Sequence, residues 1–167
     1  MRRLLRTTIM ALVALTLPAL SAASPTPVPG GANQVAGVEG RFGSTLFNGE
    51  LRVKALSLTK ATAADNLPSI AGKQWLIFRA LVSNGTKSTY GGYFNASIVD
   101  ADGVTVSAVG GNMNPYPATN ILPGAAWRQQ ISFNVPSDFV PTKIVLVPSN
   151  SKYKAFLIQV GKNDLPQ

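Results

Sequence analysis

The sequence predicts an all-β protein, an immunoglobulin-like antiparallel β-sandwich of about seven strands. Three observations support this prediction. Apolar residues recur at the two-residue period of a strand, the runs are short and separated by turn sequences, and no stretch shows the 3.6-residue period of a convincing helix. A small closed β-barrel is the alternative that the same pattern allows.

The strand at the centre of the prediction covers residues 74–84 and ends in the turn dipeptide Asn84-Gly85. Its even positions are all apolar: Leu76, Phe78, Ala80 and Val82. Its odd positions mix apolar and polar side chains: Trp75, Ile77, Arg79, Leu81 and Ser83. At least one face should therefore meet a core, and the mixed face could serve as an interface with another molecule.

The strand before it begins near Glu50, where apolar Leu51, Val53 and Ala55 alternate with cationic residues. The phase then slips, so that Leu56 and Leu58 are the apolar residues. Because a slip of one residue turns every following side chain to the other face, we expect a β-bulge near Ala55.

The strands after the centre include a hairpin over residues 94–99 and 104–109, joined by Asp100-Ala101-Asp102-Gly103. Asp-Gly is typical of a tight hairpin turn because it tolerates positive φ angles. Residues 127–135 alternate most regularly, which predicts one buried face and one wet face. Two short apolar runs, at residues 144–147 and 156–160, complete the seven strands.

The N-terminus predicts export. Arg2, Arg3 and Arg6 precede an apolar run over residues 9–20, and small residues follow, so we expect residues 1–23 to be a signal peptide cleaved after Ala23. A retained anchor is the alternative. Residues 24–45, rich in Pro and Gly at their start, read as a leader or linker, and residues 46–167 as the sandwich domain. No other stretch is predicted to cross a membrane, so the protein should be secreted or periplasmic.

The composition excludes several kinds of site. The chain has no His and no Cys, which excludes Ser-His-Asp and Cys-His catalysis, His or thiolate zinc sites, disulfides and a lipid-bearing cysteine. Its net charge of +8 includes the three signal arginines, and without them 12 cationic side chains oppose 7 acidic ones. These cations are dispersed and no nucleic-acid motif is present, so nucleic acid is not an expected partner.

The order of several motifs resembles a family of exported bacterial immunoglobulin-like domains of unknown function. Members carry labels such as immunoprotective extracellular or telomeric-repeat-factor-like. The resemblance covers about residues 46–160 and lies in four motifs: Trp75 through Asn84-Gly85, Asp100-Ala101-Asp102-Gly103, Leu122-Pro123-Gly124, and Phe133-Asn134-Val135-Pro136. It implies the fold and export, and it carries no catalytic residues. Many members resemble lipoproteins, whose anchoring cysteine this chain lacks.

If successive strands alternate in direction, loops 85–93, 110–126 and 148–154 meet at one end of the sandwich. These loops hold every tyrosine of the chain together with several asparagines. Tyrosine offers contact area at little entropic cost, so this end is the candidate binding surface for an envelope protein or glycan. The candidate residues are Tyr90, Tyr93, Asn112, Asn114, Tyr116 and Tyr153. The alternative is that Tyr90 and Tyr93 simply pack at the edge of the sandwich.

The opposite end should collect four of the five aspartates: Asp65, Asp100, Asp102 and Asp138. Clustered carboxylates could hold Ca²⁺, but each of these residues stands in a common turn sequence, and Val104 and Val106 occupy positions where an EF-hand needs ligands. We therefore expect no metal, no cofactor and no catalysis.

The sequence thus favours a non-catalytic exported binding domain. An accessory envelope protein that assembles through a sheet face, and an inhibitor of an extracellular enzyme, are the alternatives. The oligomeric state stays open.

Overall fold

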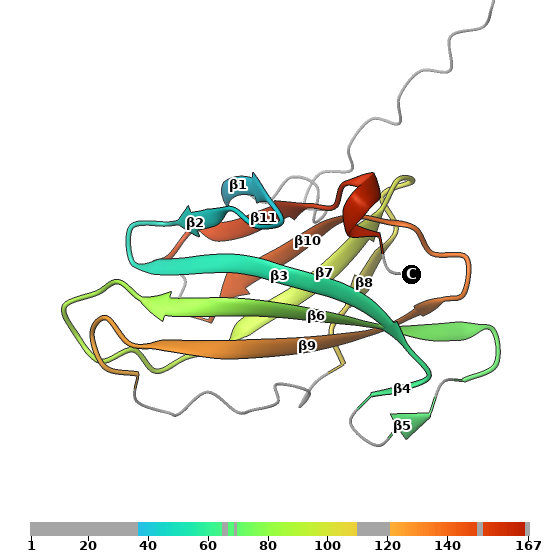
Figure 1. Cartoon of the computed structure of the whole chain (residues 1–167), viewed down its shortest axis with the longest axis horizontal. Helices are drawn as coiled ribbons and strands as arrows, with labels where there is room; N and C mark the ends of the chain where they lie inside the picture. Colours follow the sequence, from blue (N-terminus) through green and yellow to red (C-terminus); the bar gives the residue numbers. More distant parts are fainter. Residues whose placement is uncertain (1–36, 65–66, 69, 110–120, 150–151, 166–167) are drawn as a thin grey trace, which may run out of the picture.

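The computed structural model describes residues 37–64, 67–68, 70–109, 121–149 and 152–165. They form two main β-sheets packed face to face and one small two-stranded sheet (Figure 1). The first sheet contains, in spatial order, β1 (Gly37–Arg41), β11 (Ala155–Gln159), β10 (Pro141–Pro148), β7 (Phe94–Asp100) and β8 (Thr105–Ser107). The second contains β2 (Thr45–Phe47), β3 (Leu51–Ala61), β6 (Lys73–Asn84) and β9 (Ala126–Pro136). The β-sandwich predicted from the sequence is confirmed.

All seven expected strands are present, as β3 and β6 to β11, and the structure adds shorter ones. β4 (Ala63–Ala64) and β5 (Leu67–Pro68) pair with each other inside the connection before β6. A single turn of 3₁₀ helix, η2 (Lys162–Asp164), follows β11. The predicted signal peptide, residues 1–23, lies outside the described residues, and no helix in the described part is long and apolar enough to cross a membrane.

Two findings differ from the expectation at the N-terminal side. β1 and the start of β2 lie in residues 37–45, which the sequence predicts to be leader because Gly37 and Gly40 give this segment a linker-like composition. β1 is also parallel to β11, pairing from Gly37 with Ala155 to Arg41 with Gln159, whereas a purely antiparallel sandwich was expected. Residues 37–45 therefore belong to the sandwich and edge both sheets.

β6 is central to the second sheet, between β3 and β9. Its even residues 76–82 are fully buried in the core between the sheets, as predicted. The expected bulge is also present, because the β3–β6 register shifts between Ala55 and Ser57 and leaves Leu56 exposed. The bulge thus keeps both Ala55 and Leu58 on the core side of β3.

The mixed face of β6 is covered within the chain. Trp75 is only 2% exposed and Ile77 only 8%, and both pack with Ala64 and partly buried Val109 on the outer side of the second sheet. The segment after β8 reaches this sheet through a hydrogen bond from the Val109 N–H to the Ser132 carbonyl, 3.1 Å. The idea that Trp75 and Ile77 form an exposed assembly interface is therefore wrong, because the chain itself buries them.

Candidate functional site

The described parts of the three loops that were expected to meet at one end, residues 85–93, 121–126 and 148–149 with 152–154, do lie together. We call this surface the tyrosine end and define it as residues 47–50, 85–93, 121–125, 149 and 152–154. Hydrogen bonds join its segments in pairs: Asn48 Nδ2 to the Lys154 carbonyl (2.9 Å), Gly85 N to the Glu50 carbonyl (2.7 Å), Ser149 N to the Tyr93 carbonyl (2.8 Å), and Tyr90 with Ile121 in both directions (2.9 Å). Loops from both sheets are thus held in one connected unit.

Asn84 is the residue that holds most of these loops. Its side chain is 1% exposed and uses both ends of the amide. Nδ2 donates to the carbonyls of Ser88 and Ile121, each at 2.8 Å, and Oδ1 accepts from the Thr86 N–H at 2.9 Å and the Thr86 hydroxyl at 2.7 Å. Because a buried amide satisfied on both sides fixes its partners, Asn84 sets the path of the chain from Gly85 to Ser88.

Tyr90 is a support of this end and not part of its surface. Its side chain is 4% exposed, stacks on Trp127 with ring centroids 6.0 Å apart, and lies 6.1 Å from the Tyr153 ring. Burial raises the pKa of the Tyr90 phenol, the Tyr153 phenol raises it further, and the nearby Ser149 hydroxyl partly offsets the rise. No hydrogen bond of regular geometry reaches the Tyr90 hydroxyl among the described residues. Tyr90 was a candidate contact residue, and its burial supports the packing alternative instead.

The other candidate residues divide in two. Tyr93 is 53% exposed, so its ring is free to meet a partner, while Tyr153 is partly buried against Tyr90. A variant of Tyr153 would therefore disturb packing as well as any contact. Asn112, Asn114 and Tyr116 lie outside the described residues.

Sequence reasoning missed two apolar residues on the same end. Leu122 is 64% exposed in the turn before β9, and Phe47 is 46% exposed at the end of β2, where the Arg52 guanidinium lies 4.4 Å from the centre of its ring. Leu122 stands beside Pro123-Gly124, a turn signal that identified the loop but not its exposed side chain. Together with Tyr93, these residues give the tyrosine end exposed apolar side chains on loops that hydrogen bonds hold in place.

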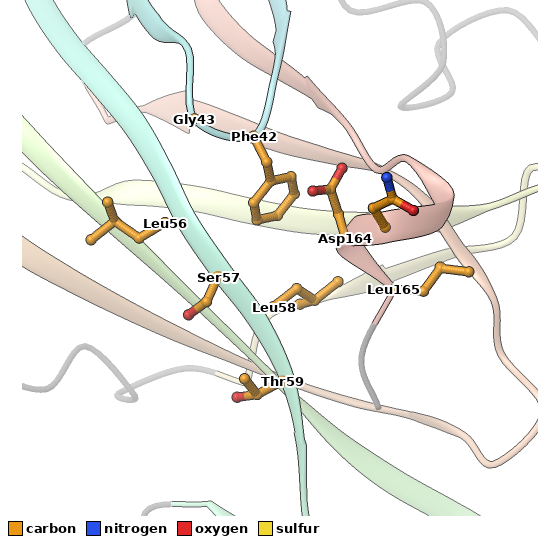
Figure 2. A pocket seen from close by; sticks show the side chains of 9 residues that line it. Phe42, Gly43, Leu56, Ser57, Leu58, Thr59, Asp164 and Leu165 are labelled. Atoms are coloured by element: carbon orange, nitrogen blue, oxygen red, sulfur yellow. The ribbon is translucent and has the colours of Figure 1, made fainter.

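A separate groove opens on the side of the sandwich, between β3 and η2 (Figure 2). Its volume is about 570 Å³. It is lined by Phe42, Gly43, residues 56–59 of β3, and residues 163–165. A second opening of about 800 Å³ adjoins it past Arg41 and Gln159, and the two share Phe42, Asn163 and Asp164. We call the first of these the side groove.

The described acidic residues do not gather into a metal site. Within the described ranges, no three side chains among His, Cys, Asp and Glu lie close enough together to hold an ion, and Asp65 is outside those ranges. The Asp100 carboxylate accepts hydrogen bonds from the backbone N–H groups of Asp102 and Val104, at 3.0 and 2.8 Å. Asp100 therefore shapes the predicted β7–β8 hairpin, where Gly103 has a positive φ of 83°.

The chain matches no known family model, and no curated protein is detectably similar to it. Three solved bacterial structures share its fold. A secreted protein from Mycobacterium tuberculosis, MPT63, has a TM-score of 0.55 at 21% identity, covering 74% of this chain and 97% of that one. An uncharacterized β-sandwich protein from Clostridium difficile has a TM-score of 0.53 at 11% identity, covering 77% and 97%. A conserved hypothetical protein from Bacillus anthracis has a TM-score of 0.52 at 10% identity, covering 69% and 93%. At these identities the likeness shows the fold, and the chain is a β-sandwich of the kind found in a secreted bacterial protein.

Proposed function

We propose that this chain is an exported, non-catalytic binding protein of the bacterial cell envelope and a member of the exported immunoglobulin-like family that its sequence resembles. It recognises an envelope protein or glycan with the exposed side chains of the tyrosine end. The N-terminal sequence with three arginines and an apolar run supports export, and the secreted neighbour of the same fold is consistent with it.

The observation that carries the proposal is that different residues of the tyrosine end hold the loops in place and face the solvent. Asn84 and the buried ring of Tyr90 hold the loops, while Tyr93 and Leu122 remain more than half exposed on them. Loops that are already ordered lose little conformational entropy on binding, so more of the contact energy appears as affinity. Cationic side chains that are also exposed at this end, on Lys87 and Lys154, favour an anionic partner surface.

The proposal is tested by recovery of a partner from envelope extract of the producing bacterium, with the exported protein as bait. The informative variant is Tyr93→Ser combined with Leu122→Ser. Because a few exposed anchors carry most of the binding energy at an interface, we expect recovery to fall about tenfold or more.

The matched control removes two apolar residues of similar exposure from the opposite end, Val104→Ser with Val140→Ser; these valines are 52% and 54% exposed, against 53% for Tyr93 and 64% for Leu122. The control should recover the partner as well as wild type does. Equal recovery by all three proteins would remove the tyrosine end from the function. Recovery of an extracellular enzyme whose activity the wild-type protein blocks, and the double variant does not, would make the protein an inhibitor that uses the same surface.

A further inference from the structure

The outer edge of β3 is open along its second half. β2 pairs only with Arg52, Val53 and Lys54, and the Gly43 N–H adds one bond to the Ala55 carbonyl, 3.1 Å. From residue 56 to residue 61, β3 pairs with β6 alone in the part of the chain that the structure describes. Since backbone groups along a strand point alternately to either side, every second residue of this stretch directs its N–H and C=O away from the sheet.

The edge is open because the chain, coming from β1, first reaches β3 at Gly43. After β1, residues 41–44 form a turn closed by a hydrogen bond from the Ser44 N–H to the Arg41 carbonyl, 3.2 Å, and Gly43 adopts a φ of 79°. The chain thus comes alongside β3 only from Thr45 onward. A strand added beside residues 56–61 would continue the line of β2 over about 20 Å.

The side groove lies directly along this open edge. Phe42 and Leu58 lie between β3 and η2 in Figure 2, and half-buried Leu165 stands on the far side. The Phe42 ring meets the core edge-on through Phe78, with centroids 6.0 Å apart. An extended chain paired with β3 would therefore place every second side chain over an apolar floor that connects with the core.

The charges around the groove favour one sign of partner. Exposed Arg41 and Lys162 border the adjoining opening, and Lys60 follows Leu58 on the same side of β3 after the bulge. Two carboxylates stand against these three cations, and both already accept hydrogen bonds. Asp164 accepts one from the Gly161 N–H at 2.9 Å, and Glu39 accepts one from the side chain of Gln159. A partner segment that carries acidic side chains complements this rim.

We propose that the open edge of β3 and the side groove bind an extended acidic peptide segment of a partner protein, which adds as a strand to the second sheet. Backbone hydrogen bonds to residues 56–61 supply affinity, and the alternate side chains that face Phe42, Leu58 and Lys60 supply specificity. A second copy of this chain is a poorer occupant because it would bring its own Arg41, Lys60 and Lys162 against the same cations. This site is separate from the tyrosine end.

The probe is a fluorescent synthetic peptide of nine residues with the sequence Thr-Glu-Thr-Val-Thr-Val-Thr-Glu-Thr. Two further peptides carry N-methyl groups, one on the threonines and one on the other four residues. Only one of these two sets can point its N–H groups at β3, so one methylated peptide should bind at least tenfold more weakly and the other should bind like the parent. Binding is measured by fluorescence anisotropy on the full exported protein.

Two protein measurements complete the test. Backbone amides within residues 56–61 should exchange with deuterium more slowly when the peptide is bound. Lys60→Glu should reverse the preference of the protein, from the glutamate peptide to one with lysine in its place, by about threefold or more. Tyr93→Ser should leave peptide binding unchanged.

The proposal is overturned if both methylated peptides bind equally, if the protected amides lie outside β3, or if no binding occurs at millimolar peptide. Self-association of the protein would also overturn it in favour of a second copy, if sedimentation detects a dimer and hydrogen exchange shows that the dimer protects the same amides.

Discussion

Tyr90 and Trp127 stack across one end of the sandwich, with ring centroids 6.0 Å apart and ring planes inclined by 19°. Tyr90 belongs to the loop before β7 in the first sheet, and Trp127 belongs to β9 in the second. The pair therefore links the two sheets where their loops emerge. At this end one tyrosine, Tyr90, is buried and joins the two sheets, while another, Tyr93, is exposed on the same loop.

Replacing Tyr90 by phenylalanine should cost little stability at neutral pH. The variant keeps the stacked ring and removes a buried hydroxyl that has no regular hydrogen bond, so the free energy of unfolding should change by less than about 1 kcal/mol. Urea denaturation measures this change. A loss of several kcal/mol would show that the hydroxyl makes a strong hydrogen bond.

The same residue predicts a loss of stability at alkaline pH. The pKa of Tyr90 is raised in the folded protein above its ordinary value of 10.0, mainly by burial. When the pH rises above 10.0, the unfolded chain loses the phenol proton, while the folded chain keeps it up to its higher pKa. The free energy of unfolding therefore falls as pH rises through this range. Wild type should lose stability more steeply above pH 10 than Tyr90→Phe does. Identical pH profiles would contradict the assignment.

Asn84→Ala should destabilise the protein by about 3 kcal/mol, because it removes four side-chain hydrogen bonds and leaves buried groups without partners. Asn84→Asp separates the two sides of the amide, since it keeps the acceptor for Thr86 but loses the donor to Ser88 and Ile121. Hydrogen exchange in this variant should therefore increase at residue 121 more than at residue 86. A neutral Asn84→Ala variant would show that Asn84 does not organise the loops.

Gly40→Ala should destabilise the contact between β1 and β2. A Cβ at position 40 would lie 2.2 Å from Leu46 Cδ2, and Leu46 is itself buried in the core. We expect a loss of about 1–3 kcal/mol, as for other overpacked cores. Leu46→Val added to Gly40→Ala should cost less than the two single changes summed, because it removes the clashing region. Strict additivity in this double-mutant cycle would place the effect elsewhere.

Deletion of Leu56 should leave a folded protein. In the β3–β6 register Leu56 has no partner, and Ala55 and Ser57 face the consecutive residues Ala80 and Arg79. Its removal turns the bulge into a regular strand and keeps every core side chain inward. Arg79 lies opposite Ser57 on β6, which has no bulge. Its deletion should instead abolish cooperative unfolding, because it turns the following core residues of β6 outward. Loss of the folded state in both deletions would contradict this role of the bulge.

The seven main strands and the bulge could be predicted because they depend on local alternation. Residues 51–58 show the phase slip directly, and Asp100-Ala101-Asp102-Gly103 specifies its hairpin by turn chemistry. β1 could not be predicted in this way. It is only five residues long, contains two glycines, and forms because β11 lies parallel beside it and Leu46 fills the space above Gly40.

The sequence predicts where the candidate site lies, but not which of its side chains are exposed. Strand direction alone brought Tyr90 and Tyr153 to the same end, as the structure shows. Whether a ring faces in or out depends on its neighbours. Tyr90 is buried because Trp127 offers a stacking face, and Tyr93, three residues later, is exposed beside Ser149. The side groove has no sequence signal, since its lining comes from three separate parts of the chain.

Hydroxyl-radical footprinting of this protein, with and without envelope extract, tests the central claim most directly. The account predicts that Tyr93 and Leu122 react in the free protein and become protected in the extract, while Tyr90 stays unreactive in both. Reactivity of Tyr93 that is unchanged when a partner is bound would contradict the claim that the tyrosine end is the binding surface.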